Sequence, residues 1–389
     1  MGNFCSPRKS EQLKAELLSE AKLNPQFEAA LRSKLFSNHA DKIINEFEKF
    51  LLLQAIKASE SPAGNFKPLL ASPIIDQVWR HAILYTKYYT DHSQRLVGRF
   101  GLGFIHRIDP RTLEPKEAYD AYNETLRMYD VHIGRNFRKG EARSLPMLLW
   151  PEYSSPDEMQ LDLNLYVWIN DEKKAQLKKA AIESLHKDSQ KQIDPKKLAA
   201  DLATGLPAQS PSEVVTLKIP ADPRVNMEKV EGLQLKYAQL MNGSQLPPKF
   251  MEILMNEQMI SASLAKEWIA EYKKYLLMCY ISNESVSPSR EVDEVWHLHQ
   301  HFTEEYAKFC QEMFGCLLVH APSAHDGSEK EDFMAHYNKT LDFYSKLFGE
   351  IPRHIWPEAA VRFGPANRNW VNLNKFVEAV VMLEKLPVN

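Results

Sequence analysis

A pattern of residues that occurs twice constrains the fold of this chain most. The two occurrences agree in residue type, order and spacing at several places. The pairs are Asp76-Gln-Val-Trp79-Arg80 with Asp293-Glu-Val-Trp296-His297, Phe100-Gly101 and His106 with Phe314-Gly315 and His320, Tyr122-Asn-x-Thr-Leu with Tyr337-Asn-x-Thr-Leu, and Trp150-Pro-Glu with Trp356-Pro-Glu. Matches that keep one order over such a distance indicate an internal duplication into two related modules, rather than a solenoid of short repeats.

Apolar residues recur every three to four positions through most of both modules, which indicates amphipathic helices. This periodicity predicts helices within residues 10–36, 43–56, 73–88 and 117–129. Pro73 suits the beginning of its helix, because the first N–H of a helix has no helical partner. The fold class that follows is mainly α, with two related helical modules.

The middle of the chain has a different pattern. Residues 159–169 alternate apolar and more polar positions, which predicts a half-buried strand, and 213–219 is a second candidate strand. A small α+β insert or linking domain is therefore expected there. The chain then divides into a leader at 1–36, a first helical module at 37–154, the insert at 155–225, and a second helical module at 226–389.

Composition argues against several functional classes. The formal net charge is −3, so there is no basic excess to bind nucleic acid through phosphate contacts. No apolar run approaches the ~18 to 20 residues of a membrane-spanning helix. The four cysteines contain no CxxC pair, which favours a reducing compartment and a cytoplasmic location.

The first nine residues, Met-Gly-Asn-Phe-Cys-Ser-Pro-Arg-Lys, carry a targeting signal. Gly2 with Ser6 fits the N-myristoylation pattern, although Pro7 departs from it, and Cys5 is a candidate for palmitoylation. Two acyl chains together hold a membrane where one is marginal. We therefore expect a peripheral attachment to the cytoplasmic face of a membrane, with a disordered polar leader as the alternative.

The chemistry-bearing residues gather in the second module. Asp293, His297, His299 and His320 are the candidate metal ligands, and imidazole with carboxylate suits zinc or iron. Asp293 and His297 are four residues apart and share a helix face. His299 lies about 200° around the helix from His297, so it joins them only if the helix ends or another partner intervenes. His320 requires a long-range approach.

The first module provides an internal comparison. It keeps Asp76, Trp79 and His106, but has Arg80 and Ala82 at the positions of His297 and His299 in the other module. A metal site of this kind therefore exists once or not at all. The alternative is structural: the tryptophan anchors a core, the aspartate accepts an N–H, and the histidine is a buried side chain with its hydrogen bonds made.

The run from Asp293 through Trp296, His297 and His299 to Phe314-Gly315 and His320 resembles the repeated motif of the glycine-rich domain-containing protein-like family. The resemblance covers roughly residues 40–150 and 265–360 and lacks the glycine-rich tail that names the family. It implies a helical fold and little mechanism, because the family is associated with plant growth and stress responses without an established reaction.

These observations favour a non-catalytic interaction or regulatory protein with a protein partner. One alternative is a metal-dependent enzyme that uses the His297 and His320 cluster. Another is a bacterial effector that acts at host membranes. The chain has no Walker loop, GxGxxG, HExxH or GxSxG motif, and a thiol nucleophile at Cys310 is a weaker enzymatic alternative.

Overall fold

The part of the chain that the structure describes is mainly helical. The computed structural model describes residues 7–32, 40–61, 66–134, 149–160, 217, 219–242, 246–258, 260–320 and 330–363. Within these ranges no strand forms, and the strand-like pairing is an isolated bridge between Val225 and Ser282. The predicted mainly α fold class is confirmed. None of the described helices is long and apolar enough to cross a membrane.

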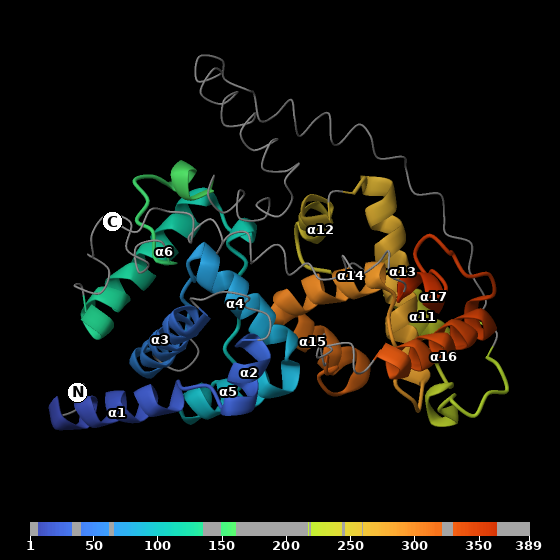
Figure 1. Ribbon diagram of the computed structural model, residues 1–389, viewed down its shortest axis with the longest axis horizontal. Coiled ribbons are helices and arrows are strands. Elements are labelled where there is room, and N and C mark those ends of the chain that lie inside the picture. Colours follow the sequence, from blue (N-terminus) through green and yellow to red (C-terminus); the bar gives the residue numbers. More distant parts are fainter. Residues whose placement is uncertain are drawn as a thin grey trace, which may run out of the picture.

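The helices form two groups along the chain, which we call the first half (residues 7–160) and the second half (residues 217–363) (Figure 1). The first half contains α1 (Pro7–Glu20), α2 (Pro25–Arg32), α3 (Ala40–Glu60), α4 (Pro73–Leu84), α5 (Thr86–Val97), η1 (Gly98–Phe100), η2 (Pro110–Thr112), α6 (Pro115–Tyr129) and η3 (Asp130–Gly134). The second half contains η5 (Met227–Lys229), α11 (Leu233–Asn242), α12 (Phe250–Gln258), α13 (Ala262–Ile281), α14 (Arg290–His301), α15 (Thr303–Phe314), α16 (Lys330–Phe348) and α17 (Ala359–Arg362).

Serine caps fix where the two central helices begin. The Ser72 side chain accepts the N–H of Ile75 at the start of α4, and the Ser289 side chain accepts the N–H of Val292 at the start of α14. Such a cap satisfies one of the N–H groups that a helix leaves without a partner. The single helix predicted over 73–88 is wrong in one respect, because the chain breaks at Tyr85 between α4 and α5.

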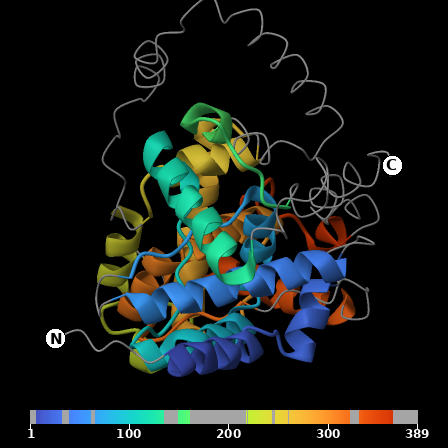
Figure 2. The same cartoon turned by 90° about the vertical axis from the view of Figure 1, so that its left-hand side faces the viewer.

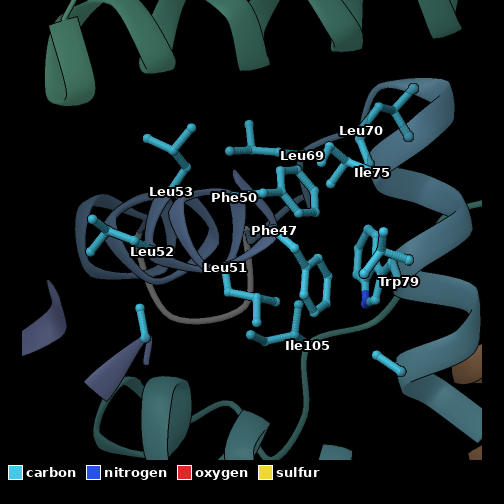
Figure 3. Close-up of a cluster of buried hydrophobic side chains, with 14 of the residues drawn as sticks. Phe47, Phe50, Leu51, Leu52, Leu53, Leu69, Leu70, Ile75, Trp79 and Ile105 are labelled. Atoms are coloured by element: carbon cyan, nitrogen blue, oxygen red, sulfur yellow. The ribbon is translucent and has the colours of Figure 1, made fainter. Parts of the chain in front are cut away.

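The core of the first half forms around α3, which runs between α1 and α6 (Figure 2). Phe47 and Phe50 of α3 point toward Trp79 of α4, with Ile105 beside them (Figure 3). The Phe50 and Trp79 ring centroids are 5.0 Å apart in an edge-to-face arrangement, and all four side chains are fully buried. Burial of large aromatic side chains supplies much of the stabilisation of such a core.

The two halves contain matching hydrogen bonds around a buried tryptophan. Trp79 Nε1 donates to Tyr89 Oη at 2.6 Å, and Tyr89 Oη donates to the Ile105 carbonyl at 2.8 Å. In the second half Trp296 Nε1 donates to Tyr306 Oη at 2.8 Å, and Tyr306 Oη donates to the Leu318 carbonyl at 2.9 Å. The same local architecture thus occurs in both halves.

A second set of matching hydrogen bonds surrounds a buried glutamate. Glu46 accepts from Tyr129 Oη and Trp150 Nε1, as Glu271 accepts from Tyr344 Oη and Trp356 Nε1. All four tyrosine and tryptophan side chains are fully buried, so their donors need these acceptors. Trp150 and Trp356, which the sequence pairs, thus occupy matching places, and the common origin of the halves stays a prediction.

Several predicted segments lie wholly or mostly outside the described residues. Gly2 and Cys5 are outside, as is most of the predicted insert at 155–225. At the beginning of the predicted strand at 159–169, the two described residues belong to a helix that starts at Pro156, so the strand is wrong there. The alternation of apolar residues did not decide the backbone conformation at this point.

Candidate metal centre

Three candidate ligands converge beside α14. Asp293 and His297 lie one helical turn apart on α14, and His320 reaches them from the segment that follows α15. His297 Nε2 is 3.1 Å from His320 Nε2, and Asp293 Oδ1 is 3.4 Å and 3.6 Å from these two atoms. These are three of the four ligands predicted from the sequence, and the turn after α15 supplies the long-range approach of His320.

The spacing of the three atoms fits the coordination shell of a metal ion. With bonds of about 2.0 to 2.1 Å, two ligands of a tetrahedral zinc ion are separated by about 3.3 Å. The three distances in the cluster range from 3.1 to 3.6 Å. A single ion can therefore contact Asp293, His297 and His320 with little movement of the side chains.

The hydrogen bonds of His320 define which ring nitrogen faces the cluster. Its Nδ1 is 3.0 Å from the carbonyl oxygen of Leu84, which only accepts, so Nδ1 carries the proton of the neutral ring. Nε2 then presents a lone pair to His297 and Asp293. A histidine ligand whose other ring nitrogen donates to a backbone carbonyl is a common arrangement in metal sites.

A proton satisfies this cluster less well than a metal ion. A proton on His297 Nε2 can point at His320 Nε2, but Asp293 Oδ1 is buried and has no hydrogen-bond partner. A cation at the centre would contact all three lone pairs at once. The donor set of two imidazoles and one carboxylate suits zinc or non-haem iron.

Asp293 is ionised at neutral pH. Burial alone would raise its pKa, but positive charge on the His297 and His320 rings, when they are protonated, outweighs burial and holds the pKa of Asp293 at about 2. The side chains of Asp293 and His297 are 21% and 24% exposed, so solvent reaches the edge of the cluster. An ion held there would be open to a water molecule or a small ligand.

The first half holds an ion pair at the corresponding place. Arg107 Nε and Nη2 donate to the two carboxylate oxygens of Asp76 at 2.6 and 2.7 Å, and Arg80 projects from α4 one turn after Asp76. Guanidinium groups remain protonated and have no lone pair for a metal. The carboxylate is thus neutralised by arginine in the first half and faces two imidazoles in the second.

The counterpart of His320 is Arg107, and the predicted pairing of His320 with His106 is wrong. The backbone N–H of His320 donates to Thr86 Oγ1 at 3.2 Å, and the N–H of Arg107 donates to Thr303 Oγ1 at 2.8 Å. The segment from Gly315 to His320 is one residue shorter than the segment from Gly101 to Arg107. His320 therefore corresponds to Arg107 and not to His106. Sequence spacing alone hid this difference.

His299 does not join the cluster. It is buried on another side of α14, where its Nδ1 is 2.9 Å from Tyr272 Oη and its ring packs against Phe309 and Tyr306. Burial lowers the pKa of His299 to about 3, so it is a neutral core residue. Burial also raises the pKa of the Cys310 thiol to about 11, which opposes its use as a thiolate nucleophile.

The cluster lies at the contact between the two halves. α4 packs against α14 in the centre of the molecule (Figure 1). Arg80 Nε donates to His301 Nδ1 at 3.2 Å, and Arg80 Nη2 donates to Glu257 of α12 at 2.6 Å. The contacts of Leu84 and Thr86 with His320 belong to the same interface. Neither Leu84 nor Thr86 was expected from the sequence, although a threonine follows the tryptophan by the same spacing in each half.

The fold and the cluster define a helical protein with a candidate two-histidine, one-carboxylate metal centre. Over residues 236–336 the chain matches the family described as UCP032817-like. The expected link to the glycine-rich domain-containing protein-like family is therefore wrong, because the family model that matches is a different one. Comparison with curated proteins found no match, and comparison with solved structures found none either.

Proposed function

We propose that the second half binds one divalent transition-metal ion, zinc or iron, through Asp293 Oδ1, His297 Nε2 and His320 Nε2. The observation that carries this proposal is the mutual separation of these atoms, 3.1 to 3.6 Å, with Asp293 Oδ1 buried and lacking a hydrogen-bond partner. The first half supports the proposal by comparison. It has Arg80 and Arg107 at the equivalent places, and arginine cannot bind a metal, whereas the histidines of the second half can.

The arrangement favours a metal-dependent enzyme over a non-catalytic interaction protein. Structural zinc sites are closed by four protein ligands, whereas catalytic sites use three and leave a position open. A metal ion with an open position acts as a Lewis acid and lowers the pKa of a bound water molecule. The partial exposure of Asp293 and His297 would admit that water and a substrate.

Elemental analysis of protein purified without a histidine tag tests the proposal. We expect about one equivalent of zinc or iron in the wild type after reconstitution, and its loss in His297→Ala and His320→Ala variants that keep their helical circular dichroism. His336→Ala is the matched control, because this exposed histidine contacts only the backbone of its own helix among the contacts described. Equal metal content in all four proteins would contradict the assignment.

Cobalt substitution tests the open position. The Co²⁺ form should show visible absorption that changes when azide is added, because azide would occupy the position that water holds. A cobalt spectrum insensitive to azide would indicate a closed structural site. That result would favour a non-catalytic interaction protein over a metal-dependent enzyme.

Attachment to a membrane through Gly2 and Cys5 is a separate proposal that rests on the sequence. It would place the metal centre near the cytoplasmic face of a membrane. Metabolic labelling with a myristate analogue tests it: label should enter the wild type and not Gly2→Ala. A wild type without label would remove the acylation proposal and leave the metal centre unaffected.

A further inference from the structure

His320 is a ligand candidate of the second half that is held by the first half. Its ring Nδ1–H donates to the Leu84 carbonyl at 3.0 Å, and its backbone N–H donates to Thr86 Oγ1 at 3.2 Å. We infer that Leu84 and Thr86 are positioning residues for the metal centre, so the first half completes a site in the second half. This inference rests on the proposed function.

The break between α4 and α5 makes these two acceptors available. α4 ends at Leu84, and the last carbonyl groups of a helix have no helical N–H to accept. Thr86 begins α5 and is buried, and its hydroxyl donates to Gln300 Oε1 of α14 at 3.3 Å. Thr86 therefore connects the segment that carries His320 with the helix that carries the other two ligands.

The contact to Leu84 acts on the metal through the imidazole ring. The hydrogen bond at Nδ1 fixes the tautomer and the plane of His320, so that the Nε2 lone pair faces Asp293 and His297. A bound cation draws electrons from the ring and makes Nδ1–H a stronger donor to Leu84. Metal binding and the contact between the halves should therefore strengthen each other, because such a coupling is reciprocal.

The near-symmetry of the interface supplies a matched control. Thr303 accepts the backbone N–H of Arg107 at 2.8 Å, as Thr86 accepts that of His320, and both threonines are buried at the same contact. Arg107 holds Asp76 in an ion pair and offers no ligand to a metal. Loss of either hydroxyl should weaken the interface, but only the loss at Thr86 should weaken the metal site.

The experiment compares Thr86→Val with Thr303→Val in the full chain. Zinc dissociation constants are measured by competition with a chromophoric chelator, and melting temperatures are measured without metal. We expect Thr86→Val to raise the zinc dissociation constant about 10- to 100-fold, the usual effect of losing a group that orients a ligand. Thr303→Val should lower the melting temperature comparably and leave the zinc dissociation constant near that of the wild type.

Two further variants distinguish the loss of the hydroxyl from a general folding defect. Thr86→Ser retains the hydroxyl and should bind zinc as the wild type does, whereas Thr86→Ala removes the hydroxyl without adding a methyl group to the buried site. Wild-type zinc affinity in both Thr86→Val and Thr86→Ala, or an equal loss in Thr86→Val and Thr303→Val, would overturn the inference alone. A wild type that binds no zinc or iron would overturn the metal centre and this inference with it.

Discussion

At the scale of single residues, the nature of the site depends on what faces one carboxylate. Asp76 and Asp293 occupy matching places on α4 and α14. Asp76 accepts two hydrogen bonds from Arg107, whereas Asp293 faces His297 and His320. Arginine neutralises a carboxylate permanently, while neutral imidazole adds lone pairs. The two sites thus differ at two positions: the first half has Arg80 and Arg107 where the second half has His297 and His320.

Exchange of both histidines for arginine should convert the second site into the first. The double variant His297→Arg, His320→Arg should keep its circular dichroism, because the fold already accommodates arginines at the matching places. It should bind no metal, since guanidinium cannot coordinate. Elemental analysis and cobalt titration measure this. Retention of a stoichiometric metal would show that other residues hold it.

The buried tyrosines provide a second residue-level prediction. Tyr306→Phe removes the acceptor of Trp296 Nε1 and the donor to Leu318, so we expect a loss of about 1 to 3 kcal/mol in the free energy of unfolding. Zinc affinity should fall as well, because Leu318 lies two residues before His320. Tyr89→Phe is the control. It should lose a similar amount of stability in urea unfolding and should keep the zinc affinity of the wild type. An equal effect of both variants on zinc affinity would contradict the local argument.

At the scale of elements, one glutamate in each half joins a helix to distant segments. Glu271 of α13 accepts from Tyr344 of α16 and from Trp356, which precedes α17. Lys274 also contacts Glu271, at 2.8 Å. These donors are separated from α13 by long stretches of chain, so the glutamate fixes how α16 packs on the rest of its half.

Removal of that acceptor should loosen α16 more than the remainder of the second half. Glu271→Ala leaves two buried donors without a partner, each at a cost of about 1 to 3 kcal/mol. Urea unfolding measures the total, and hydrogen exchange should show faster exchange in α16 than in α14. Uniform exchange, or a total loss below about 0.5 kcal/mol, would contradict this role.

Much of the helical architecture could be predicted from the sequence, because it follows from local rules. Apolar periodicity located α3 and α6, and Pro73 marked the beginning of α4. The break at Tyr85 was missed, since apolar residues continue on both sides of it. Its consequence is large: the break provides the acceptors that hold His320.

At the scale of the whole molecule, a network of buried and half-buried charges joins the halves. It consists of three arginines and three carboxylates: Arg80, Arg107, Arg111, Asp76, Asp109 and Glu257. Burial alone would raise the pKa of Glu257, but Arg80 and Arg111 hold it at about 2, below the usual 4.5. Burial likewise opposes charge on Asp109, and the same kind of arginine contact holds its pKa far below 3.8.

This network should make the protein less stable in acid. Below pH 4.5 the unfolded chain binds protons at Glu257 and Asp109 that the folded chain excludes, so the free energy of unfolding falls as the pH decreases toward 2. Glu257 contributes on the order of 3 kcal/mol to this fall. The variant Glu257→Gln should be less stable than the wild type at pH 7. Its free energy of unfolding should fall less than that of the wild type between about pH 5 and about pH 3, the range around the pKa of an unfolded glutamate.

Urea unfolding across this pH range measures the effect, with Glu228→Gln, a change at an exposed glutamate, as the control. The control should follow the wild type throughout. Wild-type pH dependence in Glu257→Gln would show that the network between the halves does not titrate as described.

The candidate site was predictable in part. The helix spacing of Asp293 and His297 indicated a shared face, and the first module showed that arginine stands at the position of His297. The partner of His320 could not be predicted, because Leu84 and Thr86 belong to the other half and meet it only in the folded chain. The pairing with His106 failed because one residue is missing from a turn, a change that spacing alone does not reveal.

Anomalous diffraction from crystals of the zinc-loaded protein tests the central claim most directly. We expect one strong peak within about 2.0 to 2.2 Å of Asp293 Oδ1, His297 Nε2 and His320 Nε2, with at least one further ligand from solvent. Zinc bound elsewhere, or no ordered zinc while His297 Nε2 and His320 Nε2 remain in direct contact, would contradict it.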